Sequence, residues 1–94
     1  IVSDIPSRVR LNQNYPNPFN PTTQITYELA NPANVSLDIY SVTGKKIMTL
    51  ENNRFRQAGT HTVSFEGSNL ASGIYIYQLK ANDQVFTRKM TLIK

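Results

Sequence analysis

The sequence contains no cysteine and no tryptophan, and it has one histidine and four glycines among its 94 residues. Without cysteine a disulfide framework is excluded, so the fold must rest on apolar packing. No apolar run approaches the roughly 20 residues that a helix needs to span a bilayer, so membrane insertion is not predicted. The start resembles no signal peptide and has no methionine. We therefore expect a fragment of a longer protein, with any export signal upstream.

The net charge of +4 and the isoelectric point near 9.6 raise the question of nucleic-acid binding. A surface that follows a phosphate backbone gathers its basic residues on one face, interleaved with exposed aromatic residues. Here the ten lysines and arginines are spread along the whole chain. The sequence therefore predicts a mildly cationic surface and no nucleic-acid partner.

The residues that carry chemistry are few and dispersed. The six carboxylates show no spacing typical of an acid–base pair, and with His61 as the sole histidine no serine–histidine–aspartate triad can be assembled. The inward register of His61 predicts a partly buried structural side chain. A calcium site in the asparagine-rich residues 11–23 is not predicted, because carboxylates are absent there. We expect no catalytic residue, no metal and no cofactor.

Alternation of apolar and polar residues with period two predicts strands at residues 23–29, 35–40, 46–50, 60–65, 73–81 and 85–93. Residues 1–10 are expected to form a linker or a further edge strand, and residues 11–94 the domain. Short strands at intervals of about ten residues, separated by turn residues, are typical of two packed sheets. The predicted fold is an all-β, immunoglobulin-like β-sandwich of about seven antiparallel strands.

Several finer expectations accompany this pattern. Residues 35–50 should form a hairpin whose turn ends at Gly44, and the apolar residues 73–81 should form a central strand. Residues 52–59 read as a polar loop, with Phe55 as a lid over one end of the core. Asp38 falls on an outward face, Glu51 lies at a strand end, and Met90 and Leu92 should anchor the last strand in the core.

All five prolines lie in the first third of the chain, and three of them belong to an asparagine- and proline-rich segment. Proline fixes φ and lacks an N–H group, while asparagine closes turns with the backbone groups left unpaired. We expect a rigid loop in which Leu11, Tyr15 and Phe19 plug one end of the sandwich. The structural leader motif consists of Asn14, Tyr15, Pro16, Asn17, Pro18, Phe19, Asn20 and Pro21.

Tyr75 and Tyr77 share one face of their strand, so they either sit in the core or line an exposed platform. An exposed pair of rings would stack on sugars, which keeps carbohydrate binding open as an alternative function. A passive spacer or adhesion module is a further alternative.

Four blocks of the sequence together resemble type A C-terminal sorting domains of the type IX secretion system. Residues 14–21, followed by the strand at 25–29, resemble the start of the family, and residues 38–47 resemble its central hairpin. Residues 70–79 resemble its Ser-Gly-x-Tyr strand, and residues 88–94 its closing strand with a terminal lysine. The outline is also similar to the immunoglobulin-like domain of flagellar hook-capping proteins.

The resemblance implies a non-catalytic tag that directs an upstream cargo domain across the outer membrane, to the cell surface or into the medium. The implied partners are the outer-membrane secretion and sortase machinery, and we expect a monomer. A tag of this kind must present a feature that can be read after folding. Our hypothesis is that the last strand, with Arg88, Lys89 and Lys94, carries recognition through strand addition and charge.

Overall fold

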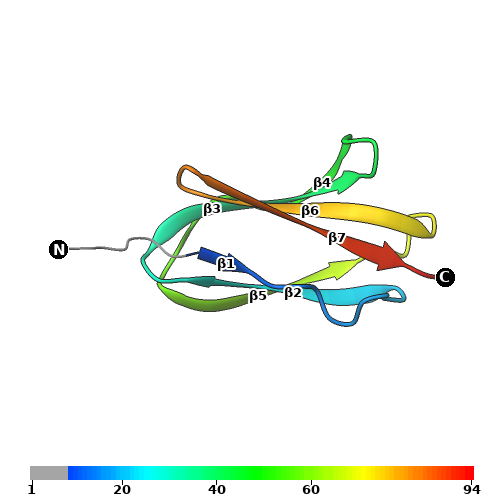
Figure 1. The fold of residues 1–94 in the computed structure, drawn as a ribbon, viewed down its shortest axis with the longest axis horizontal. Coiled ribbons are helices and arrows are strands. Elements are labelled where there is room, and N and C mark those ends of the chain that lie inside the picture. The colour runs from blue at the N-terminus through cyan, green and yellow to red at the C-terminus, as the bar shows by residue number, and fades with distance from the viewer. Residues whose placement is uncertain (1–8) are drawn as a thin grey trace.

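The computed structural model describes residues 9–94, which form seven strands and two sheets (Figure 1). The strands are β1 (Val9–Leu11), β2 (Thr22–Leu29), β3 (Ala33–Ser41), β4 (Lys46–Arg56), β5 (Gly59–Glu66), β6 (Gly73–Ala81) and β7 (Gln84–Leu92). One sheet has the order β1-β2-β5 and the other the order β4-β3-β6-β7, with every neighbouring pair antiparallel. The predicted β-sandwich is confirmed, with β6 as a central strand.

The core lies between the two sheets and is built mainly from alternate residues of β2, β3, β6 and the end of β7, as the period-two pattern predicted. Its largest fully buried side chains come from both sheets, and they include Met90 and Leu92 of the last strand. The predicted inward register of β7 is therefore confirmed. The buried residues of the core are Leu11, Phe19, Ile25, Tyr27, Leu29, Ala33, Val35, Leu37, Ile39, Phe65, Tyr75, Tyr77, Leu79, Ala81, Met90 and Leu92.

The β3–β4 hairpin turns where the sequence predicts. The backbone N–H of Gly44 donates to the carbonyl oxygen of Ser41 at 2.9 Å, and Gly44 has φ = 94°. This left-handed conformation is open to glycine at little cost because glycine has no Cβ atom. Asp38 lies on the outward face of β3, but it is only 6% exposed, which the sequence did not predict. The Thr49 hydroxyl donates to its carboxylate at 2.7 Å, and the Lys46 ammonium lies 3.8 Å away.

The polar loop predicted at residues 52–59 is wrong for most of its length. Strand β4 runs on to Arg56 and stays paired with β3 as far as Ala33. Register shifts along this pair, and a positive φ of 47° at Asn53, break the alternation that marks a strand in the sequence. Phe55 is 60% exposed and does not cover the core.

Residues 1–8 of the predicted linker lie outside the described residues. Val9 and Arg10 belong to β1, which pairs with β2 in the smaller sheet. The domain boundary at residue 11 stays a prediction.

Candidate functional site

The leader motif lies against the outer edge of the last strand, β7 (Figure 1). The Phe19 N–H donates to the carbonyl oxygen of Thr91 at 2.9 Å, and the Ile93 N–H donates to the carbonyl oxygen of Phe19 at 2.9 Å. The Asn17 side-chain oxygen accepts a hydrogen bond from the Thr91 N–H at 3.0 Å. The Gln13 side-chain amide donates to the carbonyl oxygen of Lys89 at 2.7 Å. A segment from the start of the chain therefore pairs with the backbone of the last strand.

Asn14 is the buried centre of this motif, with an exposed fraction of 2%. Its side-chain amide donates to the Thr23 hydroxyl at 2.9 Å and to the carbonyl oxygen of Pro16 at 3.1 Å. The Thr23 hydroxyl donates in turn to the same Pro16 oxygen at 2.9 Å. These contacts satisfy the Pro16 carbonyl oxygen, so the loop is closed by side chains from its own segment and from β2.

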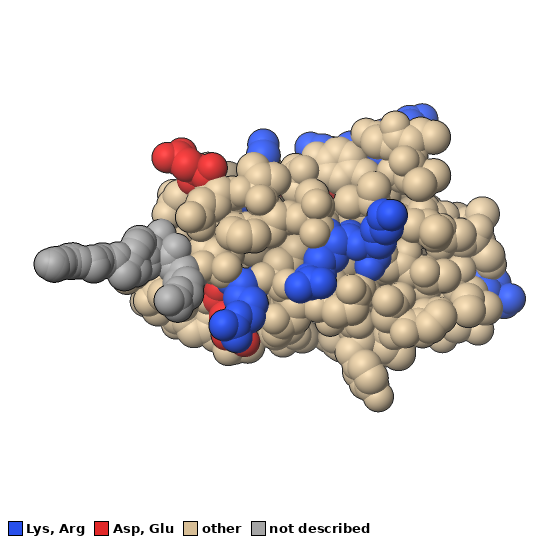
Figure 2. Space-filling model, in the orientation of Figure 1, with Lys and Arg blue, Asp and Glu red and all other residues tan. Residues whose placement is uncertain are grey.

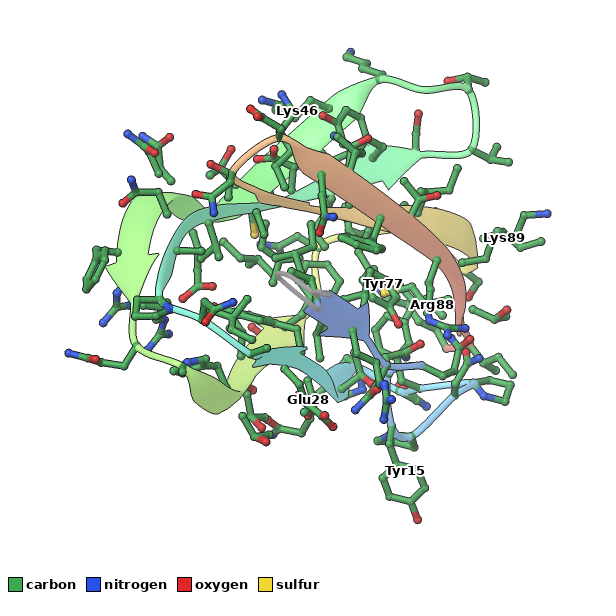
Figure 3. All side chains as sticks on the ribbon, turned by 60° about the vertical axis from the view of Figure 1, so that its left-hand side comes forward. Tyr15, Glu28, Lys46, Tyr77, Arg88 and Lys89 are labelled. Atoms are coloured by element: carbon green, nitrogen blue, oxygen red, sulfur yellow. The ribbon has the colours of Figure 1, made fainter. Side chains whose placement is uncertain are left out.

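Of the three residues predicted to plug one end of the sandwich, two are buried, and they lie at different positions along it. Leu11 and Phe19 are buried, and the Phe19 ring meets Phe65 edge-on with 6.0 Å between ring centroids. Tyr15 is 79% exposed and points away from the body (Figure 3), so its predicted place in the core is wrong. Its backbone exchanges two hydrogen bonds with Gln24 instead, which turns the side chain outward.

Tyr75 and Tyr77 are core residues and do not form an exposed platform. Tyr77 is fully buried, and its hydroxyl donates to the carbonyl oxygen of Asn12 at 2.6 Å and accepts from the Asn14 N–H at 2.8 Å. The Tyr75 hydroxyl donates to the carbonyl oxygen of Ala71 at 2.6 Å. With both rings enclosed, the geometry gives no support to sugar stacking through these two residues.

The three predicted recognition residues occupy different positions. Lys89 is exposed and extends from the body, whereas the Arg88 guanidinium donates through Nε to the carbonyl oxygen of Leu11 at 2.6 Å (Figure 3). Lys94 follows the end of β7, where its backbone N–H donates to the Ser72 hydroxyl at 3.0 Å. The five residue steps from Lys89 to Lys94 correspond to about 17 Å of extended chain. Arg88 and Lys89 are thus neighbours, and Lys94 lies apart from them.

Figure 2 shows how charge is distributed on this face. Basic side chains gather in its middle, where β7 crosses, and the acidic side chains visible in this view lie toward its left end. The face around the middle of β7 is therefore positive, because Arg88 and Lys89 have no carboxylate within 4.0 Å among residues 9–94.

A buried polar group that sequence reasoning missed lies on the other side of the core. Glu51, placed at a strand end by the sequence, is a central residue of β4 with 4% exposure. The Tyr27 hydroxyl donates to one carboxylate oxygen at 2.6 Å, and the Arg56 guanidinium donates through Nε to the other at 3.0 Å. This contact joins β2 of one sheet to β4 of the other. The one available signal was Tyr27 itself, since a buried hydroxyl requires a partner.

The two buried tyrosine hydroxyls predict how stability depends on pH. Burial raises the pKa of Tyr27, and the hydrogen bond to Glu51 raises it further. Burial also raises the pKa of Tyr77. Each tyrosine therefore ionises at a lower pH in the unfolded chain, where its pKa is near 10, than in the folded domain. Its contribution to the free energy of unfolding is complete below about pH 10 and is lost as the pH rises further.

Urea unfolding between pH 8 and 11.5 should show a loss of up to about 1.4 kcal/mol per pH unit for each tyrosine. The Tyr27→Phe variant should show a shallower loss, and equal slopes for the two proteins would contradict this assignment.

His61 is half-buried, and its Nε2 atom lies 2.7 Å from the carbonyl oxygen of Gln57. Its ring lies 5.4 Å from that of Tyr27, so it packs at the rim of the core. Within the described residues no group of three or more histidine, cysteine or carboxylate side chains could hold a metal ion. The same part of the chain contains no helix long and apolar enough to cross a membrane.

Comparison with known proteins places this arrangement in a family. No curated protein matches the chain. The family described as "Secretion system C-terminal sorting domain" matches residues 13–94, from the glutamine that binds β7 to the last lysine. This non-catalytic family provides the type IX secretion signal for export across the outer membrane, to the cell surface or into the medium. The chain belongs to the family of secretion system C-terminal sorting domains.

Proposed function

We propose that the outer-membrane export and sortase machinery recognises this sorting domain through the basic residues of its last strand, Arg88, Lys89 and Lys94. The observation that carries the proposal is the position of β7 at a sheet edge, with Arg88 and Lys89 on an exposed positive face (Figure 2). Charge complementarity across an interface steers encounter and selects the partner. An acidic surface of the machinery is the complement that this strand requires.

The leader motif has a structural role in this proposal. Asn14 and Phe19 are buried and Asn17 binds β7, which leaves Tyr15 as the one exposed large hydrophobic side chain of the motif. The domain itself is proposed to have no catalytic activity. In support, the buried titratable groups of residues 9–94 are bound to one another, to backbone groups or, for Asp38, to the Thr49 hydroxyl.

The domain is further proposed to act as a monomer attached to its cargo. The exposed edge β7 has two adjacent basic residues, and like charges brought together across a strand pair are destabilising. This argument disfavours association of two copies through the edge that the machinery reads.

The test is a fusion of residues 1–94 to a periplasmic reporter, expressed in a host that has the type IX system. We expect the Lys89→Ala and Lys94→Ala double variant to lower surface delivery by about tenfold, equivalent to about 1.4 kcal/mol of lost recognition. Delivery is measured as the fraction of reporter that added protease can reach on intact cells. Arg88 is left unchanged because its guanidinium also holds the backbone of Leu11.

The matched control removes two other exposed lysines, Lys45 in the hairpin turn and Lys80 in β6, and lowers the net charge equally. Both double variants should keep the unfolding free energy of the parent within about 0.5 kcal/mol, since the changes are on the surface. If the control is exported as poorly as the Lys89 and Lys94 variant, net charge and not position decides export. Normal export of both variants would overturn the proposal.

A further inference from the structure

The outer edge of β7 is divided into a closed half and an open half. In an antiparallel pair, alternate residues direct their N–H and C=O groups toward the partner strand and away from it. Thr91 directs both groups away from β6, because its N–H and C=O bind Asn17 and Phe19. The odd-numbered residues of β7 therefore face the outer edge. From the carbonyl of Lys89 onward, Gln13 and the leader motif occupy that edge.

Val85 and Thr87 are also odd-numbered, so their backbone N–H and C=O groups face the outer edge of β7. They precede the part of the strand that contacts the leader. Within residues 9–94, the backbone pairing of this part of β7 is with β6 alone, which uses the even-numbered residues. A shallow groove of about 390 Å³ lies beside this stretch, lined by Gln13, Ile76, Thr87, Arg88 and Lys89. The open backbone groups thus adjoin a hollow that carries two positive charges.

We infer that an extended acidic segment of the export machinery adds as a strand along the first half of β7, opposite Val85 and Thr87. The leader motif blocks the second half, so it fixes where the added strand must stop. Carboxylates of the incoming segment meet Arg88 and Lys89 at the groove. This inference rests on the proposed function, and it moves the backbone contact away from the C-terminal end of the strand.

The charge of the edge distinguishes an acidic segment from a second copy of this chain. Two copies paired in parallel and in register along this edge would place Arg88 and Lys89 of each opposite the same residues of the other. Like charges facing each other across strands are destabilising, and lysine on an edge discourages such pairing. An acidic strand uses the same backbone groups and gains from both charges.

Hydrogen exchange in the isolated 94-residue chain tests the division of the edge directly. The amides of Val85 and Thr87 should exchange rapidly, whereas those of Thr91 and Ile93, which bind the leader, should exchange at least about a hundredfold more slowly. Strong protection of Thr87 would overturn the inference, since its edge would then be occupied within the chain or by a second copy. Sedimentation at several concentrations identifies the second copy.

Export of the reporter fusion tests the added strand. Thr87→Pro removes an N–H from the open edge, and it removes no bond to β6 because Thr87 faces outward. We expect surface delivery to fall by about five- to tenfold. Val85→Pro should lower surface delivery similarly. Agreement of the two variants would show that the effect does not come from a folding defect at one position. Thr87→Val keeps the N–H and should be delivered normally.

Ser64→Pro is the matched control on the other sheet. The bond from the Gly67 N–H to the carbonyl oxygen of Pro21 fixes odd-numbered residues of β5 as those that face β2, so Ser64 faces the open edge. This variant should be exported normally. If export requires Lys89 and Lys94 but tolerates both proline changes in β7, the charge proposal stands and the strand-addition inference fails. If the Ser64→Pro variant also loses surface delivery, proline acts through folding, and the inference is equally overturned.

Discussion

Replacing Phe19 with alanine is expected to lower the free energy of unfolding by about 3–5 kcal/mol, the range for a buried phenylalanine. The ring is 1% exposed and packs edge-on against Phe65, and its Cε2 atom lies 3.6 Å from the position a Cβ atom would take at Gly67. Little space is available for neighbours to collapse into, so a cavity remains. Urea denaturation at pH 7 measures the loss.

The same variant should release the end of β7, because the Phe19 backbone exchanges hydrogen bonds with Thr91 and Ile93. Faster exchange of the Ile93 amide, beyond what the global loss of stability explains, would report this release. Tyr15→Ala is the control within the motif, since that ring is 79% exposed. Its expected effect is within about 0.5 kcal/mol. Equal losses for the two variants would contradict the structural assignment of the motif.

Glu51→Ala is expected to cost about 2–4 kcal/mol, because it leaves the Tyr27 hydroxyl buried without its acceptor and removes the partner of Arg56. The Arg56 side chain is 22% exposed, so it can turn partly toward water, which keeps the loss below that of a fully enclosed charge. Thermal and urea unfolding both measure the effect.

Double substitution separates the hydroxyl from the ion pair. If the contact between Tyr27 and Glu51 joins the sheets, Tyr27→Phe in the Glu51→Ala background should cost less than Tyr27→Phe alone. Additive losses would mean that the two side chains act independently. Glu28→Ala is the control carboxylate in β2, since its pair with Arg10 is exposed and should contribute within about 0.5 kcal/mol.

The sequence predicted the sheets well where one face of a strand is buried throughout. Residues 73–81 form β6 with the predicted bounds, because its apolar residues follow a glycine and continue until the turn at Asn82 and Asp83. The predicted strand at 85–93 is β7, displaced by one residue. The alternation of buried and exposed residues follows from the geometry of a single strand, so it can be recognised without knowing which strand is the partner.

The predictions were wrong where the burial of a side chain depends on contacts between segments that are distant in the sequence. Tyr15 and Phe19 are both aromatic residues of the same motif, and only the pairing of Tyr15 with Gln24 decides which ring is buried. Glu51 reads as a polar strand end, because its partners Tyr27 and Arg56 meet it only after the sheets stack. Likewise, no local sequence pattern indicates that the leader covers the edge of β7. The recognition roles of Arg88, Lys89 and Lys94 stay predictions.

The contacts of Gln13 and the leader motif with the last strand and Ile93 join residues that are 72 to 76 positions apart. Such distant pairs close late, because the entropy of a long loop opposes them until the intervening strands have folded. A chain still on the ribosome has its leader but no β7, and a chain that has lost its leader leaves the Thr91 and Ile93 backbone groups open to unintended strands. The covered half of the β7 edge therefore forms only in a chain that has both ends and has folded the strands between them.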